Sequence, residues 1–122
     1  MIIDHIGFGV ADFEKSKRFY TSCLAPLGIT LIREEGNTVG FGKNSKAMYW
    51  FGPSSDPCKK MHVAFIAENR SQVDEFYSAA LAAGGTANGA PGIRDIYHSD
   101  YYGAFVLDPD GHNVEAVCHK HE

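Results

Sequence analysis

The sequence has little of what several large classes of protein require. Eleven Lys and Arg stand against 15 Asp and Glu, a formal net charge of −4, and no basic cluster is longer than Lys59-Lys60. That balance argues against a nucleic-acid partner. No apolar run approaches the roughly 18 residues that cross a bilayer, and Asp4 and His5 stand where a signal peptide would be hydrophobic. We therefore expect a cytoplasmic protein that binds neither nucleic acid nor membrane.

Cysteine is also scarce and unpatterned. Cys23, Cys58 and Cys118 show neither CxxC spacing nor a disulfide framework, so reduced thiols are expected. The chain has 122 residues, 44% of them hydrophobic, which is ordinary for one globular domain. A domain of this size folds without a metal or a disulfide. Any metal site is therefore expected to serve function rather than stability.

An internal repeat organises the chain. Residues 5–28 align without a gap to residues 62–85, at an offset of 57, with 7 identities in 24 positions. A segment rich in turn-forming residues, 53–59, separates the copies. We predict a single domain over residues 1–122, made of module one (1–52), a linker (53–59) and module two (60–122).

Both copies predict the same order of elements. Period-two alternation opens each copy, and 3.6-residue periodicity follows it. The first helix is expected to begin near Asp12 and end around Gly28, and the second to run from a Ser71 cap to Gly84. Further strand-like runs are Ile29–Arg33, Thr38–Gly42, Ala47–Gly52, Tyr101–Leu107 and Asn113–Cys118. Residues 86–99 are expected to form a loop with at most one weak strand. The prediction is an α+β fold of two tandem βαβββ modules, whose paired sheets form a concave cleft.

Strand alternation gathers three polar side chains on the concave face. His5 and His62 point away from the helices, and Glu115 interrupts an apolar last strand. A lone buried charge is costly, and two imidazoles with one carboxylate satisfy each other well through a divalent cation. The alternative is that the histidines have protein partners and that Glu115 pairs with a Lys or Arg. The symmetric placement favours a metal site formed by His5, His62 and Glu115.

These residues, with Phe19-Tyr20 and the segment 108–116 (DPDGHNVEA), resemble the vicinal oxygen chelate superfamily over essentially the whole chain. That superfamily includes glyoxalase I, fosfomycin-modifying transferases, extradiol dioxygenases and bleomycin resistance proteins. The resemblance implies a divalent metal ion (Fe, Mn, Ni or Zn) on the same three ligands. It also implies a homodimer, because relatives often complete their sites across a dimer.

The resemblance implies a metal-dependent lyase, isomerase, transferase or dioxygenase that acts on a small substrate chelated through vicinal oxygens. Glyoxalase I supplies a further carboxylate from the fourth strand, where this chain reads Ala47-Met48-Tyr49-Trp50-Phe51, and this counts against glyoxalase I activity. The alternative function is a non-catalytic small-molecule binding protein similar to the bleomycin resistance proteins.

Aromatic and polar residues near the cleft are candidates for substrate contact. In the functional interpretation, Arg94 holds an anionic group, Tyr101 binds substrate, and His98 and Tyr102 act in catalysis. The alternative makes the tyrosines half-buried strand residues and His98 a solvated loop residue. Tyr49 and Trp50 either pack in the core or line a pocket beside the metal.

Overall fold

A computed structural model describes residues 2–122, so Met1, the first residue of the predicted first module, lies outside the described residues. The first half contains β1 (Ile6–Val10), α1 (Phe13–Leu24), the 3₁₀ helix η1 (Ala25–Leu27), β2 (Thr30–Glu35), β3 (Thr38–Lys43) and β4 (Lys46–Pro53). The second half contains β5 (His62–Ile66), α2 (Arg70–Ala82), β6 (Thr86–Ile93), β7 (Tyr102–Leu107) and β8 (Asn113–Cys118). Both halves are βαβββ modules, which confirms the predicted α+β class.

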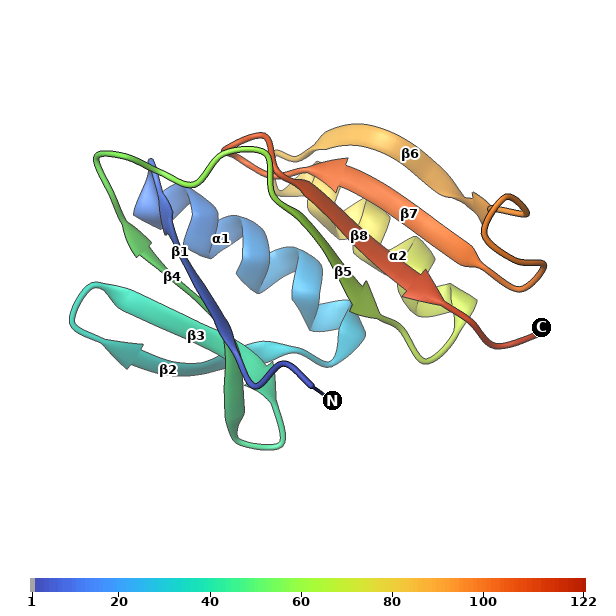
Figure 1. Cartoon of the computed structure of the whole chain (residues 1–122), viewed down its shortest axis with the longest axis horizontal. Helices are drawn as coiled ribbons and strands as arrows, with labels where there is room; N and C mark the ends of the chain where they lie inside the picture. The colour runs from blue at the N-terminus through green and yellow to red at the C-terminus, as the bar shows by residue number, and fades with distance from the viewer. Residues whose placement is uncertain (1) are drawn as a thin grey trace.

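Each module forms a four-stranded sheet, in the order β1-β4-β3-β2 in the first and β5-β8-β7-β6 in the second. The first strand of each module pairs in parallel with its last strand, and the remaining neighbours are antiparallel. The two sheets lie side by side with α1 and α2 packed together behind them (Figure 1). The helices thus cover one face of each sheet and leave the other open.

The helix ends follow local capping chemistry. The Asp12 side chain accepts a hydrogen bond from the Lys15 N–H (3.1 Å), which confirms the predicted start of α1. After η1, Gly28 adopts a left-handed conformation (φ 77°) that favours glycine. The cap of α2 is Asn69 rather than Ser71, because the Asn69 side chain accepts from the Gln72 N–H (2.8 Å). Within residues 2–122, no helix is long and apolar enough to cross a membrane.

Strand β6 is longer than the sequence predicts. Residues 86–93, expected to lie in a loop with at most one weak strand, form the eight-residue β6 along the outer edge of the second sheet. Its pairing with β7 shifts register on both sides of Gly89, which has φ 154°. The glycines and proline in this segment hide its strand character, because they lower strand propensity and occur where a strand is irregular or forms an edge.

The core is continuous between the modules. The helices bury Phe19, Tyr20 and Leu24 of α1 and Phe76 of α2 against the sheets. Phe8 of β1 contacts Tyr49 at a ring-centroid distance of 5.2 Å, and Tyr49 in turn contacts Phe65 of β5 at 5.1 Å. Aromatic packing therefore joins the two modules on their helix-covered faces.

A buried hydrogen-bond network also crosses between the modules. Tyr20 donates to Asp108 Oδ2 (2.5 Å), and the Tyr49 hydroxyl donates to the Tyr20 hydroxyl (3.0 Å). The other oxygen, Asp108 Oδ1, accepts from the N–H groups of Asp110 and His112, each at 2.9 Å. Asp108 therefore closes the predicted turn between β7 and β8 and at the same time bonds the first module.

Candidate metal centre

Two of the three predicted metal ligands meet on the open face of the second sheet. His62 begins β5 and Glu115 lies in β8, and these strands pair with Ala64 opposite Glu115. His62 Nε2 donates to Glu115 Oε1 at 2.9 Å. The His62 side chain is 54% exposed, whereas the Glu115 side chain is 2% exposed. The pair thus combines a buried carboxylate with an imidazole that solvent can reach.

The loop between β6 and β7 contributes a second contact to Glu115. Tyr101, at the end of that loop, donates its hydroxyl to Glu115 Oε2 in a short hydrogen bond. Gly103 makes room for this contact: a Cβ there would lie 3.2 Å from the Tyr101 ring and 3.4 Å from Glu115 Oε2. Burial, followed by the hydrogen bond to Glu115, raises the pKa of the Tyr101 phenol above its usual value, so the hydroxyl keeps its proton.

The predicted residues of this loop have specific positions. Arg94 lies over the Phe105 ring (5.4 Å to the centroid) and donates to the Ala90 carbonyl (2.6 Å). His98 Nδ1 accepts from the Asp100 N–H (3.1 Å), which leaves Nε2 to donate to His119 Nδ1 (2.8 Å). Both ring nitrogens of His98 are therefore engaged by the loop and the C-terminal tail rather than by Glu115.

Tyr102, predicted from the sequence to act in catalysis, lies apart from Glu115. Its hydroxyl donates to Asp74 of α2 (2.6 Å), and the Arg70 guanidinium lies 5.1 Å from its ring centroid. These contacts place Tyr102 on the helix-covered side of the sheet, away from Glu115. The physical reason is strand alternation, which sends adjacent side chains to opposite faces, so Tyr101 and Tyr102 cannot share a pocket.

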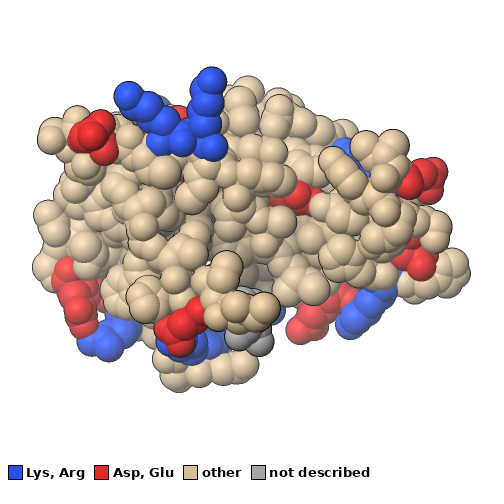
Figure 2. Space-filling view, in the orientation of Figure 1, with Lys and Arg blue, Asp and Glu red and all other residues tan. Residues whose placement is uncertain are grey.

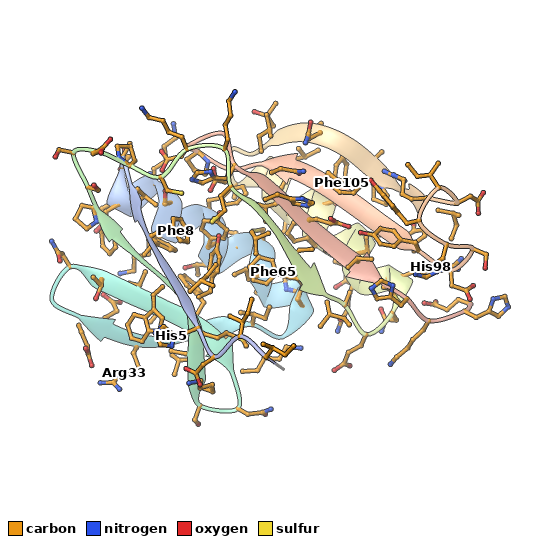
Figure 3. All side chains as sticks on the ribbon, in the orientation of Figure 1. His5, Phe8, Arg33, Phe65, His98 and Phe105 are labelled. Atoms are coloured by element: carbon orange, nitrogen blue, oxygen red, sulfur yellow. The ribbon has the colours of Figure 1, made fainter. Side chains whose placement is uncertain are left out.

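The third predicted ligand, His5, lies over the first sheet, immediately before β1. Its Nδ1 bonds Asp4 Oδ1 (2.7 Å), and the same carboxylate oxygen accepts from Lys46 Nζ (2.7 Å). The Lys46 and His5 contacts lower the pKa of Asp4. His5 also lines an open hollow of ≈ 650 Å³, together with Arg33, Lys46 and Trp50. Figure 3 shows His5 over the first sheet and Phe105 and His98 over the second.

Trp50 and Tyr49 occupy opposite faces of β4. Trp50 lines the hollow, and a Cβ on Gly40 would come within 2.7 Å of its indole ring, so the bare Gly40 backbone is the surface that the ring covers. Tyr49 is only 2% exposed and belongs to the buried network described above. Of the two alternatives for Tyr49, the structure places it in the core, because its ring follows the helix-covered alternation. We therefore assign it no substrate contact.

The predicted triad is not assembled within one chain. Over residues 2–122, no three His, Cys, Asp or Glu side chains lie close enough to one another to hold a metal ion. Alternation correctly predicted the open face for His5, His62 and Glu115. It carries no information on the distance between the two sheets, and His5 sits on a different sheet from its expected partners.

The contact between Tyr101 and Glu115 is not among the predictions from the sequence. The available signal was the period of β7, since Tyr101, Gly103 and Phe105 are spaced by two, and Phe105 pairs directly with Glu115. These residues therefore share the face of Glu115. The short hydrogen bond itself depends on the bend of the loop, which alternation does not describe.

The sequence matches the glyoxalase/bleomycin resistance protein/dioxygenase superfamily over residues 2–116. The chain belongs to this superfamily. A glyoxalase/bleomycin resistance protein from Albidiferax ferrireducens T118 has a similar structure, with a TM-score of 0.86 and 28% identity over 97% of this chain and 99% of that one. No curated protein matches the sequence.

Two further solved structures share the fold at lower identity. A glyoxalase/bleomycin resistance protein/dioxygenase family enzyme from Burkholderia phytofirmans PsJN has a TM-score of 0.73 and 21% identity, over 97% of this chain and 98% of that one. A protein described as oxidase ChaP-H1 has a TM-score of 0.72 and 22% identity, over 98% of this chain and 97% of that one.

Proposed function

We propose that this superfamily member is a divalent-metal-dependent enzyme that acts on a small substrate through vicinal oxygens. The observation that carries the proposal is Glu115, a buried carboxylate in direct contact with a solvent-accessible imidazole on an open sheet face. Buried carboxylates require a compensating positive charge or strong donors. Imidazole nitrogen with carboxylate oxygen is a donor set that suits Fe, Mn, Ni and Zn.

The third ligand in this proposal comes from a second copy of the chain. His62 Nε2 and Glu115 Oε1 are 2.9 Å apart, whereas His5 belongs to the other sheet, outside any three-residue group. A homodimer that sets the first sheet of one protomer on the second sheet of its partner would bring His5 to the pair. The view over the open faces supports such a contact, because most Lys, Arg, Asp and Glu side chains in it lie toward the edges (Figure 2).

When bound, the cation would supply Lewis-acid stabilisation of negative charge on the substrate oxygens. His62, Glu115 and the partner-derived imidazole would hold it. Trp50 would offer a flat apolar floor beside His5, and Arg94 a cation for an anionic substrate group. Glyoxalase I chemistry is not part of the proposal. Gly7 and Ala64 are equivalent positions of the two modules, and they pair with Trp50 and Glu115 respectively. Trp50 therefore occupies the position in the first module that Glu115 occupies in the second, where glyoxalase I would need a carboxylate.

The direct test is elemental analysis of untagged protein purified without chelator. We expect about one Fe, Mn, Ni or Zn per chain, and its loss in His5→Ala and in Glu115→Gln. Absence of metal in the wild type, with none taken up from any of the four ions, would overturn the proposal. Iron together with oxygen consumption on a catechol would narrow the class to dioxygenase.

A mixing experiment tests the shared site. His5→Ala and Glu115→Gln are each expected to lose the metal, but co-expression would form hybrid dimers in which one of the two sites is intact. A statistical mixture would therefore recover about a quarter of the sites. Recovery near zero would refute the cross-protomer arrangement, whereas metal retained by the single His5→Ala variant would remove His5 from the ligand set.

The second candidate is a binding protein without chemistry. The separation of His5 from His62 and Glu115 within one chain favours it, as does the open hollow floored by Trp50. It predicts ligand binding that is unchanged in Glu115→Gln, whereas the enzyme hypothesis predicts that substrate binding and metal are lost together in that variant.

A further inference from the structure

The two oxygens of Glu115 have different partners. Oε1 contacts the exposed imidazole of His62, on the side that solvent reaches, and Oε2 accepts from the Tyr101 hydroxyl. A carboxylate with free rotation can bind a cation through either oxygen or both. In this chain one oxygen is held by a phenol, so the ligand's orientation is set before any cation arrives.

Tyr101 is itself fixed from several sides. The centroid of its ring lies 4.7 Å from that of Tyr97, 5.5 Å from that of His98 and 5.3 Å from that of His119. The backbone is fixed too, because the Tyr101 N–H donates to the His98 carbonyl (3.2 Å) and the Tyr101 carbonyl accepts from the Arg94 N–H (2.8 Å). A phenol enclosed in this way loses little entropy when it bonds Glu115.

The tail and the loop reinforce the same position. His98 Nε2 donates to His119 Nδ1, and His121 Nδ1 contacts Asp100 Oδ1 at 2.9 Å. These contacts join residues 98–100 to the segment that follows β8, the strand that carries Glu115. The loop that supplies the phenol is therefore anchored to the strand that supplies the carboxylate.

We infer that Tyr101 is a positioning residue, which holds Oε2 of Glu115 and so presents Oε1, beside His62 Nε2, as the metal-binding oxygen. The His98–His119 pair serves this role by holding the Tyr101 ring, in place of the acid–base role predicted for His98. This inference rests on the proposed metal site.

The chain offers a matched control for the test. Tyr101→Phe and Tyr102→Phe each remove one hydrogen bond from a tyrosine hydroxyl to a carboxylate, and the two positions are adjacent. Only the first touches Glu115. Titration of metal-free protein with Co²⁺, followed by calorimetry and visible absorption, should show about 10- to 100-fold weaker binding for Tyr101→Phe. Tyr102→Phe should bind as the wild type does. Equal affinity in wild type and Tyr101→Phe, or equal weakening in both variants, would overturn the inference.

A metal-free readout separates this inference from the proposed function. Wild-type protein that binds no Co²⁺ would refute the metal site but would still permit measurement of the Glu115 carboxyl carbon by ¹³C NMR, with Glu115→Gln to assign it. At constant pH, Tyr101→Phe should shift and broaden that resonance, and Tyr102→Phe should leave it unchanged. An unchanged resonance in Tyr101→Phe would mean that the phenol does not hold Glu115.

Discussion

The two sheets share one backbone plan but differ in where they place bulk and charge. On the open face of the first sheet, β4 carries Trp50, which pairs with Gly7 of β1 on one side and Gly40 of β3 on the other. The second sheet has Glu115 at the same register position, paired with Ala64 and Phe105. The large aromatic side chain is thus on β4 in the first sheet but on β7 in the second, where β8 carries a carboxylate instead.

In the proposed site, this difference gives the two sheets different tasks. The second sheet holds a buried acid against an imidazole, the pair to which we assign the cation in the proposed site. The first sheet holds one imidazole beside an open hollow with an aromatic floor, to which we assign the organic ligand. The proposed site uses both surfaces, and the proposed homodimer would set them face to face.

The largest effect that tests this comparison is optical. Trp50 is the only tryptophan in the sequence, so its emission reports on the hollow of the first sheet alone. A Co²⁺ ion shared between His5 of one protomer and His62 with Glu115 of the other would lie near Trp50, and most of its emission should be quenched. Steady-state fluorescence during Co²⁺ titration measures this.

The controls for that titration separate the two sheets. Glu115→Gln should abolish the quenching even though Glu115 belongs to the second sheet. Calorimetric binding of Co²⁺ without any change in Trp50 emission would place the ion away from the first sheet and would break the proposed pairing of surfaces.

The turns that follow the third strand of each module make a second contrast. In the first module, β3 and β4 are joined by Asn44 and Ser45, both with positive φ (53° and 64°), as a tight hairpin requires. In the second module, the turn depends on buried Asp108, which also accepts from Tyr20. The first turn is thus a local structure, whereas the second is part of the junction between the modules.

Substitution at these turns should have unequal costs. Asp108→Ala leaves the Tyr20 hydroxyl and two backbone N–H groups without their acceptor, and should lower the free energy of unfolding by about 2–4 kcal/mol. Asn44→Gly should change it by less than about 0.5 kcal/mol, because glycine accepts positive φ. Urea denaturation of both variants gives the comparison, and similar losses at the two turns would contradict it.

The sequence predicted the fold well, because the repeat and its periodicities are local signals that packing did not override. Capping at Asp12 and the turn at residues 108–111 also depend on nearby atoms. Two other features depend on information that local patterns lack. Segment 86–93 forms a strand only because β7 pairs with it. His5 carries the correct residue type on the correct face, yet its distance from Glu115 depends on how whole modules meet.

For the candidate site, the sequence indicates which types of residue are involved, but it does not show which of two adjacent aromatic residues faces the cleft. Tyr49 and Trp50 are adjacent aromatics for which the sequence leaves core and pocket open, and Tyr101 and Tyr102 are adjacent aromatics predicted to contact substrate and to act in catalysis. Each pair divides between the two faces of its sheet. Alternation shows that two adjacent residues of a strand face opposite ways, but not which of them faces the cleft. In the second sheet, the pairing of Phe105 with Glu115 decides this, because Tyr101 lies on the same face as Phe105.

The smallest expected effect is at alkaline pH, where two buried tyrosines of the first module contrast with a half-buried one of the second, Tyr102. Burial, the largest cause, raises the pKa of Tyr20 and Tyr49 well above 10.0. For Tyr102, the hydrogen bond to Asp74, with a smaller contribution from burial, raises the pKa to about 12. A raised folded-state pKa gives stability that is complete below the unfolded value and is lost as pH rises through the interval between the two. Above pH 10, the free energy of unfolding should therefore fall by about 1.4 kcal/mol per pH unit for each buried tyrosine.

The double variant Tyr20→Phe/Tyr49→Phe should show a smaller fall of the unfolding free energy with pH, although it is less stable at neutral pH because it lacks two hydrogen bonds. Tyr102→Phe should flatten this pH dependence less, because it removes one phenol of raised pKa instead of two and solvent partly screens the Tyr102–Asp74 pair. Urea denaturation at several pH values from about 9 to 11 measures the slopes. The buried thiol of Cys23, whose pKa burial also raises, contributes equally in every variant and cancels from the differences. Equal flattening by the two changes would mean that Tyr20 and Tyr49 ionise as readily as Tyr102, and hence that the junction between the modules admits water.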